Sequence, residues 1–565
     1  MRIVWLSVNT SYAHSSLSLP LLHRSAVAAE HVDTWKAVEA TPHRHVPNVF
    51  AEIADAAPDI ILGTCYLFNR DFLLRVLQRV KTIHPECTVI LGGPEFWTHN
   101  ESFLRTAPYV DAVIRGEGEA VIGDMLKKLR KGEDKWDDLS GVCRLTNGDS
   151  VYCDNGTAML SQKELEGLPP PAEDEFFDFQ KPFQQLETSR GCIGRCTFCT
   201  SSLLPGTRKF PVERVQRELD IFRRMGVREV RVLDRTFNED PRRCVQLLEM
   251  FRTHYPDMRF HLEIHPAFLT PAVREQLALF PPENLHLEAG IQTLSYAPRK
   301  SVGRPGEKQS ELEGLHFLCT ATNRNVHVDL LAGLPQMSLD DVLSDIHTTV
   351  NLDPDEIQLE ILKALPGTSL AEHAASYRIC ASPAPPYEVL QTEHMSCQQL
   401  QTATQYSKIL DDYYNNKWFK DTFQRIVGRT QEFLPSFRSY LANETGHPLD
   451  TPLSLKRRFI LLHTFLEQHY PPETPEKLNL EINWLRAGLS ASHGLRSASK
   501  WKHPVPPDAS LENGTASLIQ THNVRVWHIS QPDAERWVVV TPENGSAVYR
   551  RACRSELTPE DNRNA

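Results

Sequence analysis

The sequence lacks any apolar run that approaches the roughly 18 residues needed to span a bilayer. Its first apolar stretch, from Ile3 to Val8, is shorter than the core of a secretion signal and fits a first β-strand better. We therefore expect a protein that makes no membrane contact and works in the cytoplasm.

The sequence also lacks an excess of positive charge. Its 61 Lys and Arg residues are outnumbered by 72 Asp and Glu, which gives a net charge of -11, and the basic residues are scattered. Nucleic-acid binders are more often basic, so RNA or DNA is a disfavoured partner. The chain has 565 residues, 41% of them hydrophobic. These values are typical of a globular protein with about three or four domains.

A disulfide framework is missing as well, because the 12 cysteines are spread over the whole length. In a reducing compartment they are expected to be thiols, or metal ligands where they cluster. They cluster once, at residues 192–199.

Short apolar runs alternate with helical patterns through residues 1–135. This order predicts a doubly wound sheet of parallel strands with interleaved helices. The predicted strands are Ile3–Val8, Val32–Val38, Asp59–Thr64, Thr88–Leu91 and Ala112–Ile114. Ligands of such sheets bind beyond the carboxyl ends of the strands. The segments found there are Asn9–His14, Thr64–Arg70, Gly92–Glu95 and Arg115–Glu119.

The rest of the chain divides into four further parts. We expect a linker at 136–180 with a possible hairpin at Asn147-Gly148, and a partial (β/α)6 barrel at 181–375. A mainly helical domain is expected at 376–495. A polar tail should follow at 496–565, partly disordered over the last dozen residues, with a possible hairpin at Val524–Tyr549. The predicted barrel strands are Gln184–Thr188, Glu229–Asp234, Arg259–Ile264, Leu285–Ile291, His327–Ala332 and Glu356–Ile361.

Three cysteines with the spacing C-x3-C-x2-C follow the first barrel strand. Cys192, Cys196 and Cys199 can bind three irons of a cubane and leave the fourth without a protein ligand. Arg190 and Arg195 could offset the charge of the thiolates. A structural zinc site is the alternative, but it usually takes four ligands, and no second C-x2-C is present.

This motif, in this place, resembles the signature of the radical S-adenosylmethionine (SAM) superfamily. The resemblance implies that the open iron binds SAM, which is cleaved to methionine and a 5′-deoxyadenosyl radical. It also implies roles for strand-end residues in binding SAM or substrate, although such residues could equally cap helices. The common Gly-Gly-Glu of the second strand is replaced by Asp234-Arg-Thr. The candidates are Phe198, Asp234, Asn238, Glu288 and Gln292.

A doubly wound domain directly before such a barrel resembles the cobalamin-binding subclass. The motif that supplies a histidine ligand to cobalt in other cobalamin proteins is absent, and His14 does not have its spacing. The resemblance therefore implies cobalamin without a histidine ligand. The candidate cobalamin residues are Thr64, Asn69, Arg70, Gly92, Gly93, Glu95, Gly116, Glu117 and Gly118.

The segments beginning at Asn9 and Pro385 also resemble a bacterial branch of this subclass with a C-terminal helical domain of uncharacterised function. The expected activity is methylation of an unactivated centre in a small molecule or peptide, with a flavodoxin or ferredoxin as electron donor. Three alternatives stay open: a radical enzyme that rearranges or cyclises its substrate, a tRNA methylthiotransferase, and a non-catalytic cobalamin or redox sensor. The second would need another cysteine trio, whereas Cys65 and Cys87 stand singly.

Overall fold

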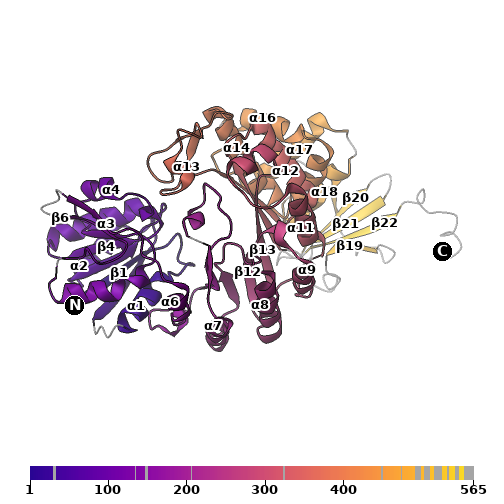
Figure 1. Ribbon diagram of the computed structural model, residues 1–565. Coiled ribbons are helices and arrows are strands. Elements are labelled where there is room, and N and C mark those ends of the chain that lie inside the picture. Colours follow the sequence, from indigo (N-terminus) through magenta and orange to yellow (C-terminus); the bar gives the residue numbers. More distant parts are fainter. Residues whose placement is uncertain are drawn as a thin grey trace. The chain divides into compact units, whose positions relative to one another are not determined.

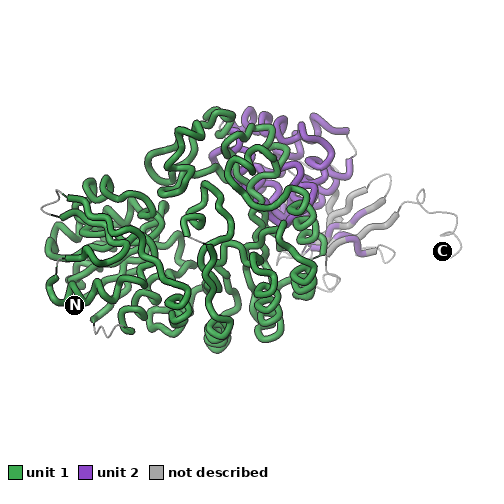
Figure 2. Tube along the Cα trace, viewed as in Figure 1, with its two compact units in different colours: residues 1–345, 360–401 green, residues 346–359, 402–565 purple. Residues whose placement is uncertain are grey.

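The computed structural model divides into two compact units (Figure 2). The first comprises residues 1–345 and 360–401, and the second comprises 346–359 and 402–565. The structure describes residues 1–28, 33–133, 135–146, 151–204, 206–321, 325–446, 449–471, 474–489, 498–501, 510–514, 525–530, 534–540 and 546–552. Within these ranges, no helix combines the length and the apolar character needed to cross a bilayer.

The N-terminal sheet has seven strands in the order β2-β1-β3-β4-β5-β6-β7 (Figure 1). Its strands are β1 (Arg2–Val8), β2 (Thr34–Ala40), β3 (Ile60–Thr64), β4 (Thr88–Gly92), β5 (Ala112–Ile114), β6 (Val142–Thr146) and β7 (Val151–Asp154). The first five are parallel and match the predicted strands closely. The predicted hairpin is formed by β6 and β7, but it extends this sheet instead of standing in a free linker. Its turn at Asn147-Gly148 lies outside the described residues.

Both faces of this sheet are covered, as a doubly wound sheet requires. Val4 and Leu6 of β1 belong to one hydrophobic core, and Ile3 and Trp5 belong to the other. The unbroken apolar run at residues 3–6 is thereby explained, since these side chains enter the two cores alternately. The helices are α1 (Ser18–Ala28), α2 (Val46–Ala54), α3 (Arg70–Ile83), α4 (Glu101–Thr106) and α5 (Ile122–Arg130), with short turns η1 (Pro94–Phe96) and η2 (Gly118–Ala120).

A short connection leads to the second sheet. It contains α6 (Gln162–Glu166) and η3 (Pro171–Glu173). The helix begins at a capping box in which the Ser161 hydroxyl accepts from the Glu164 backbone N–H, and the Glu164 carboxylate accepts from the Ser161 backbone N–H.

The central sheet has six strands in the order β15-β14-β13-β12-β11-β8, and β8 to β14 run parallel. These strands are β8 (Gln184–Leu186), β11 (Glu229–Val232), β12 (Arg259–Ile264), β13 (Leu285–Gln292), β14 (Val326–Ala332) and β15 (Glu356–Ile361). All six were predicted. Buried and half-buried residues alternate along β12, β13 and β14, so one face is apolar and the other carries polar groups. The helices are α7 (Val212–Arg224), α8 (Pro241–His254), α9 (Pro271–Ala278), α10 (Tyr296–Ser301), α11 (Lys308–Ala321) and α12 (Leu339–Leu352), with the turn η5 (Pro266–Phe268).

Helices also dominate the region that follows. The helical domain was expected from residue 376, but β16 (Cys380–Ala381) and β17 (Val389–Gln391) pair there first, and the first long helix begins at Cys397. The Thr392 hydroxyl accepts from the Met395 backbone N–H, and the Thr392 backbone N–H donates to the Met395 carbonyl, which forms a turn before that helix. The helical elements are α13 (Ser369–Glu372), α14 (Cys397–Ile409), η6 (Leu410–Tyr414), α15 (Lys420–Arg429), α16 (Phe433–Thr445), α17 (Leu455–His469) and α18 (Pro475–Arg486).

The predicted hairpin within 524–549 is present as β20 (Arg525–Ser530) and β21 (Ala534–Val540), but it is part of a five-stranded sheet that the expectation of a polar tail did not include. Its order is β18-β20-β21-β22-β19, and neighbouring strands pair antiparallel. Short strands rich in polar residues, such as Ser510–Gly514, give no clear period of two, which is why the sequence pattern missed them. The strands are β18 (Ala498–Trp501), β19 (Ser510–Gly514), β20 (Arg525–Ser530), β21 (Ala534–Val540) and β22 (Ser546–Ala552). The predicted disorder of the last dozen residues concerns positions outside the described ones.

Candidate active site

The three clustered cysteines lie in a loop whose two ends pair as a small antiparallel ribbon. The ribbon consists of β9 (Ser189–Gly191) and β10 (Thr207–Lys209). Gly191 has a φ of 94°, and a Cβ there would lie 2.1 Å from the Gly206 carbonyl oxygen. A side chain therefore does not fit at the point where the loop leaves the ribbon.

Backbone hydrogen bonds attach this loop to the rest of the first unit. The Thr197 N–H donates to the Val302 carbonyl at 3.0 Å, and the Thr197 carbonyl accepts from the Leu370 N–H at 2.9 Å. The Cys199 N–H donates to the Cys196 carbonyl at 3.1 Å. The backbone N–H and carbonyl of Thr197 thus fix the loop between Cys196 and Cys199.

The surroundings of the sulfur atoms suit an anionic cluster. The Gly194 N–H donates to the Cys192 Sγ at 3.3 Å, and the Thr236 hydroxyl lies 3.5 Å from the same sulfur. Burial raises the pKa of Cys196 to about 11, Arg304 opposes this, and the neighbouring Cys199 and Cys192 add to it. A cluster that withdraws charge from these thiolates would relieve that penalty.

No three ligating side chains within the described ranges are gathered around a single point that could hold one metal ion. A cubane places each thiolate on a different iron, so its three ligands need not converge. The donor set of Cys192, Cys196 and Cys199 therefore fits a 4Fe–4S cluster.

A cavity of about 680 Å³ lies between the N-terminal sheet and the cysteine loop. It is lined by residues that follow β1, β3, β4 and β5, where a ligand of a doubly wound sheet is expected. From the other side it is lined by Arg190, Gly191, Thr200, Ser201 and Arg235. The cavity is therefore shared by the two domains that the sequence predicted for cobalamin and for the cluster.

Six of the nine candidate cobalamin residues line this cavity, namely Thr64, Gly92, Gly93, Gly116, Glu117 and Gly118. Gly93 has a φ of 107°, and a Cβ there would lie 2.6 Å from the Cys65 carbonyl oxygen. Glycines at these strand ends leave the cavity floor open to a large flat ligand.

The other three candidates are engaged elsewhere. Asn69 is buried and its amide donates to the carbonyls of Val8 at 2.9 Å and Thr64 at 3.1 Å, so it shapes the loop after β3. Arg70 donates to the Tyr387 hydroxyl at 2.7 Å, and that hydroxyl donates to Glu95 at 2.5 Å. Arg70 and Glu95 thus hold a tyrosine from a distant part of the first unit.

The candidates for SAM or substrate binding are also divided by the structure. Asp234 accepts four hydrogen bonds, from the backbone N–H groups and the hydroxyls of Thr188 and Ser189. Asn238 is fully buried and binds the backbone of His265 in both directions. Both side chains therefore order the chain around the cysteine loop.

Glu288 and Gln292 remain on the polar face of the central sheet. The Glu288 carboxylate lies 2.8 Å from His261 Nε2, and this contact lowers its pKa to about 2. Gln292 ends β13 with a φ of 68°, at a register shift between Gly290 and itself. Phe198 is half-buried inside the cysteine loop.

Sequence reasoning missed several residues of the cavity wall. Tyr66 and Phe68 are stacked with ring centroids 5.2 Å apart and remain 37% and 38% exposed. Both line the cavity, and their flat faces suit the planar ring of cobalamin. Hydroxyl groups between β1 and the start of α1 line it too, those of Thr10, Ser15, Ser16 and Ser18. Two aromatic residues directly after an apolar strand were the available signal.

His14 also lines the cavity, as its place in the sequence suggested. Its Nδ1 lies 2.9 Å from the Ser11 hydroxyl and 3.3 Å from that of Thr10. Burial lowers its pKa, and Arg231 lowers it further. The ring is therefore held by its own loop through Nδ1.

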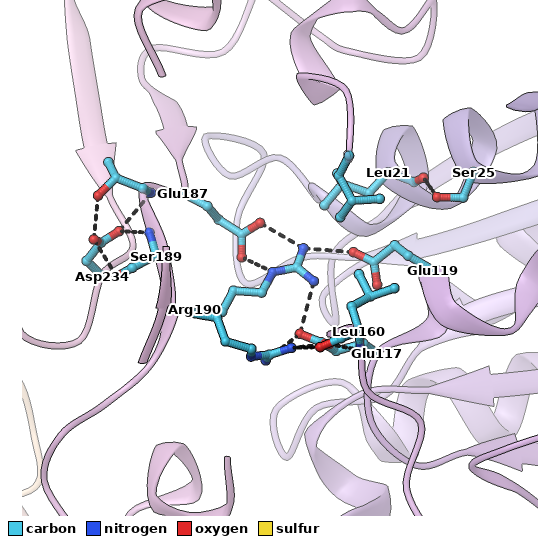
Figure 3. A network of polar contacts seen from close by, with 12 residues as sticks. Leu21, Ser25, Glu117, Glu119, Leu160, Glu187, Ser189, Arg190 and Asp234 are labelled. Carbon is cyan, nitrogen blue, oxygen red and sulfur yellow. Dashed lines mark hydrogen bonds and ion pairs between the residues drawn. The ribbon is translucent and has the colours of Figure 1, made fainter. Parts of the chain in front are cut away.

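Ion pairs join the two walls of the cavity (Figure 3). Arg190 contacts Glu119 at 2.8 Å, Glu187 at 2.9 Å and Glu117 at 3.2 Å. Glu117 also contacts Arg208 at 2.7 Å. Burial raises the pKa of Glu117, but the hydrogen bond from Arg208 and the charge of Arg190 outweigh it and lower the pKa overall. The glycine-rich loop after β5 is thus bound to the ribbon of the cysteine loop.

Three family models match separate parts of the chain. Residues 12–125 match the B12 binding domain, and residues 186–348 match the radical SAM superfamily. Residues 375–484 match a protein family of unknown function, DUF4080.

Curated relatives are distant. An uncharacterised methyltransferase of Pyrococcus horikoshii is 27% identical over 56% of this chain and 69% of its own length. The cobalamin-dependent radical SAM methyltransferase TokK of Streptomyces tokunonensis is 28% identical over 34% of this chain. The 2-(S-pantetheinyl)-carbapenam-3-carboxylate methyltransferase of Streptantibioticus cattleyicolor is 29% identical over 35% of it. The match spans only 30% of the length of each of the latter two.

Solved structures share the fold. The cobalamin-dependent SAM radical enzyme OxsB, with cobalamin and SAM bound, superposes with a TM-score of 0.59 at 15% identity over 86% of this chain and 78% of its own. The radical SAM methyltransferase TsrM of Kitasatospora setae gives 0.56 at 14% identity over 70% and 80%. The chain therefore belongs to the B12-binding radical SAM enzymes with a C-terminal DUF4080 domain, and its cofactors are a 4Fe–4S cluster, SAM and cobalamin.

Proposed function

We propose that this enzyme methylates an unactivated centre of a small molecule or peptide. The observation that carries the proposal is the shared cavity, which is lined by the cobalamin domain on one side and by the cysteine loop on the other. When bound, SAM on the cluster supplies a carbon radical and cobalamin supplies a transferable methyl group. A substrate held between them could meet both.

The residues of the chain would contribute binding and shelter. Cys192, Cys196 and Cys199 would hold the cluster, and the glycines after β4 and β5 would admit cobalamin. The apolar side chains of Trp5, Leu62 and Ile90 line the cavity floor and would keep water from a reactive radical. A flavodoxin or ferredoxin is the electron donor that we propose.

Three of the relatives support methyl transfer, since each is named as a methyltransferase. Other distant relatives are named as a magnesium-protoporphyrin ester cyclase and as a ribosomal protein methylthiotransferase. The described cysteines include no second clustered trio beside the one in the loop, which favours methyl transfer over methylthio transfer.

The test uses the full chain, reconstituted anaerobically with iron, sulfide and hydroxocobalamin, and supplied with SAM that carries a deuterated methyl group. After reduction, we expect 5′-deoxyadenosine, together with a deuteromethylated product in a metabolite or peptide extract, both detected by mass spectrometry. Deoxyadenosine without any labelled product would refute methyl transfer and favour a rearranging or cyclising enzyme. Absence of deoxyadenosine would favour the sensor alternative.

A pair of cysteine variants controls this experiment. Cys196→Ala should lose the absorbance of the cluster and all cleavage of SAM, because one iron then lacks its thiolate. Cys380→Ala removes an exposed cysteine outside the loop and should keep both. Turnover by Cys196→Ala would contradict the assignment of the cluster ligands.

A further inference from the structure

The ribbon below the cysteine loop carries two arginines directly opposite each other. Arg190 of β9 and Arg208 of β10 are register partners, and both side chains are only 10% exposed. Like charges opposite each other on neighbouring strands destabilise the pair. The ribbon therefore needs an anion beside it in order to stay closed.

Glu117 supplies that anion from the cobalamin domain. Its Oε2 accepts from Arg208 Nη1 at 2.7 Å, and its Oε1 accepts from Arg208 Nη2 at 2.9 Å. The same Oε1 accepts from Arg190 Nη1 at 3.2 Å (Figure 3). The Leu160 N–H adds a further bond at 2.8 Å. A carboxylate that is 9% exposed thus bridges two facing guanidinium groups.

The loop that carries Glu117 has little freedom to absorb a displacement. A Cβ on Gly116 would lie 2.1 Å from the Ala158 carbonyl oxygen, and that oxygen accepts from the Glu117 N–H at 2.9 Å. Gly116, Glu117 and Gly118 all line the cavity. A ligand that presses on this loop must therefore move Glu117 against the two arginines.

We infer that Glu117 is a positioning residue that couples the filling of the cobalamin cavity to the geometry of the cysteine loop. Arg190 stands two residues before Cys192, so a change in the closure of the ribbon reaches the first cluster ligand directly. Arg190 is also bound to Glu119 and Glu187, which makes it a rigid connection to the cavity wall. The inference requires the two cofactor sites alone and does not depend on methyl transfer.

The test is a linkage measurement on the cluster-loaded full chain with the cluster oxidised, so that no turnover occurs. The dissociation constant of SAM is measured with and without hydroxocobalamin, and that of hydroxocobalamin with and without SAM. Typical couplings between two sites change affinity by about 5- to 150-fold, and the factor must be the same in both directions. We expect a factor of at least about five for the wild type.

In Glu117→Gln the factor should fall to about one while both ligands still bind. This variant leaves the two guanidinium groups facing each other, so its iron content and the electron paramagnetic resonance signal of its reduced cluster should suffer. Removing one of them, in Glu117→Gln/Arg208→Gln, should restore the iron content and the signal but not the coupling. If Glu117 were merely structural, the double variant that regains the iron content would also regain the coupling between the SAM and cobalamin sites.

Arg24→Gln is the matched control, because it removes an ion pair to Glu173 in the same unit and leaves the ion pairs of Glu117 with Arg190 and Arg208 intact. It should keep the wild-type factor. If Glu117→Gln loads no iron, the double variant supplies the measurement, and Glu117→Asp, which keeps the charge on a shorter side chain, should show a reduced factor. A factor of one in the wild type, or an unchanged factor in a cluster-loaded Glu117 variant, would overturn the inference.

Discussion

Asp234 offers the sharpest test of how the structure uses its strand-end carboxylates. The side chain is buried and receives four hydrogen bonds from Thr188 and Ser189, the two residues that lead into the ribbon. Its Oδ1 accepts from the two backbone N–H groups at 2.8 and 3.0 Å, and its Oδ2 accepts from the two hydroxyls, both at 2.6 Å. If this role is structural, the shape of the side chain should matter more than its charge.

The magnitude follows from counting what each substitution leaves unpaired. Asp234→Ala leaves two backbone N–H groups without an acceptor. Because a buried donor without a partner costs about 1–3 kcal/mol, the substitution should lower the local stability by about 2–6 kcal/mol. Asp234→Asn keeps an oxygen at the Oδ1 position, and its amide N–H groups can donate to the hydroxyl oxygens. That exchange should cost only about 0.5–1.5 kcal/mol.

Hydrogen exchange at the amides of Thr188 and Ser189 reports this local stability directly. With a tenfold change for every 1.4 kcal/mol, exchange should be about 30-fold to 20,000-fold faster in the Ala variant and about two- to tenfold faster in the Asn variant. Both should be compared with their affinity for SAM. An Asn variant with wild-type exchange that no longer binds SAM would refute the structural role and make Asp234 a ligand.

Two further predictions concern the cavity and the pH dependence of stability. Gly93 and Gly156 both have a positive φ, but a Cβ at Gly93 would lie 2.8 Å from the Thr64 Cγ2, whereas one at Gly156 meets nothing within 4 Å. Gly93→Ala should weaken hydroxocobalamin binding by about 5- to 150-fold, as overpacking by 1–3 kcal/mol implies, and Gly156→Ala should leave the affinity unchanged; equal losses would contradict this. Burial raises the pKa of Glu218 to about 8, although the charge of Arg214 opposes this rise. The contribution of the Glu218 carboxyl to the stability of the fold is therefore complete below about pH 4.5 and is lost as the pH rises to about 8. Glu218→Gln should therefore match the wild type in melting temperature near pH 4.5 and exceed it near pH 8, and parallel profiles would disprove the shift.

The architecture of both parallel sheets was predictable from apolar periodicity. β12 and β15 match the predicted strands at both ends, because half-buried strands alternate and fully buried strands are apolar throughout. The cysteine spacing also placed the cluster loop directly after the first strand of the central sheet. A periodic pattern along one strand can be read from the sequence because the side chains on each face meet the same kind of surroundings at every repeat.

The uses of single polar residues were harder to predict. Asn69, Asp234 and Asn238 were expected to face ligands, yet each satisfies backbone groups that are brought near by the fold. Spacing locates the end of a strand but does not say which donors surround it. Tyr66 and Phe68 were overlooked for the opposite reason, since aromatic side chains after a strand are usually assigned to a core.

The bridge from Glu117 to Arg190 and Arg208 has a consequence for protein engineering. A chimera that takes its cobalamin domain from one relative and its radical SAM domain from another would inherit the position of Glu117 from one parent and the positions of the two arginines from the other. Parents that differ at any of these three positions would yield a hybrid with unpaired charges between its two domains, however well each domain folds. Recombination points should therefore be chosen with all three residues transferred as one module.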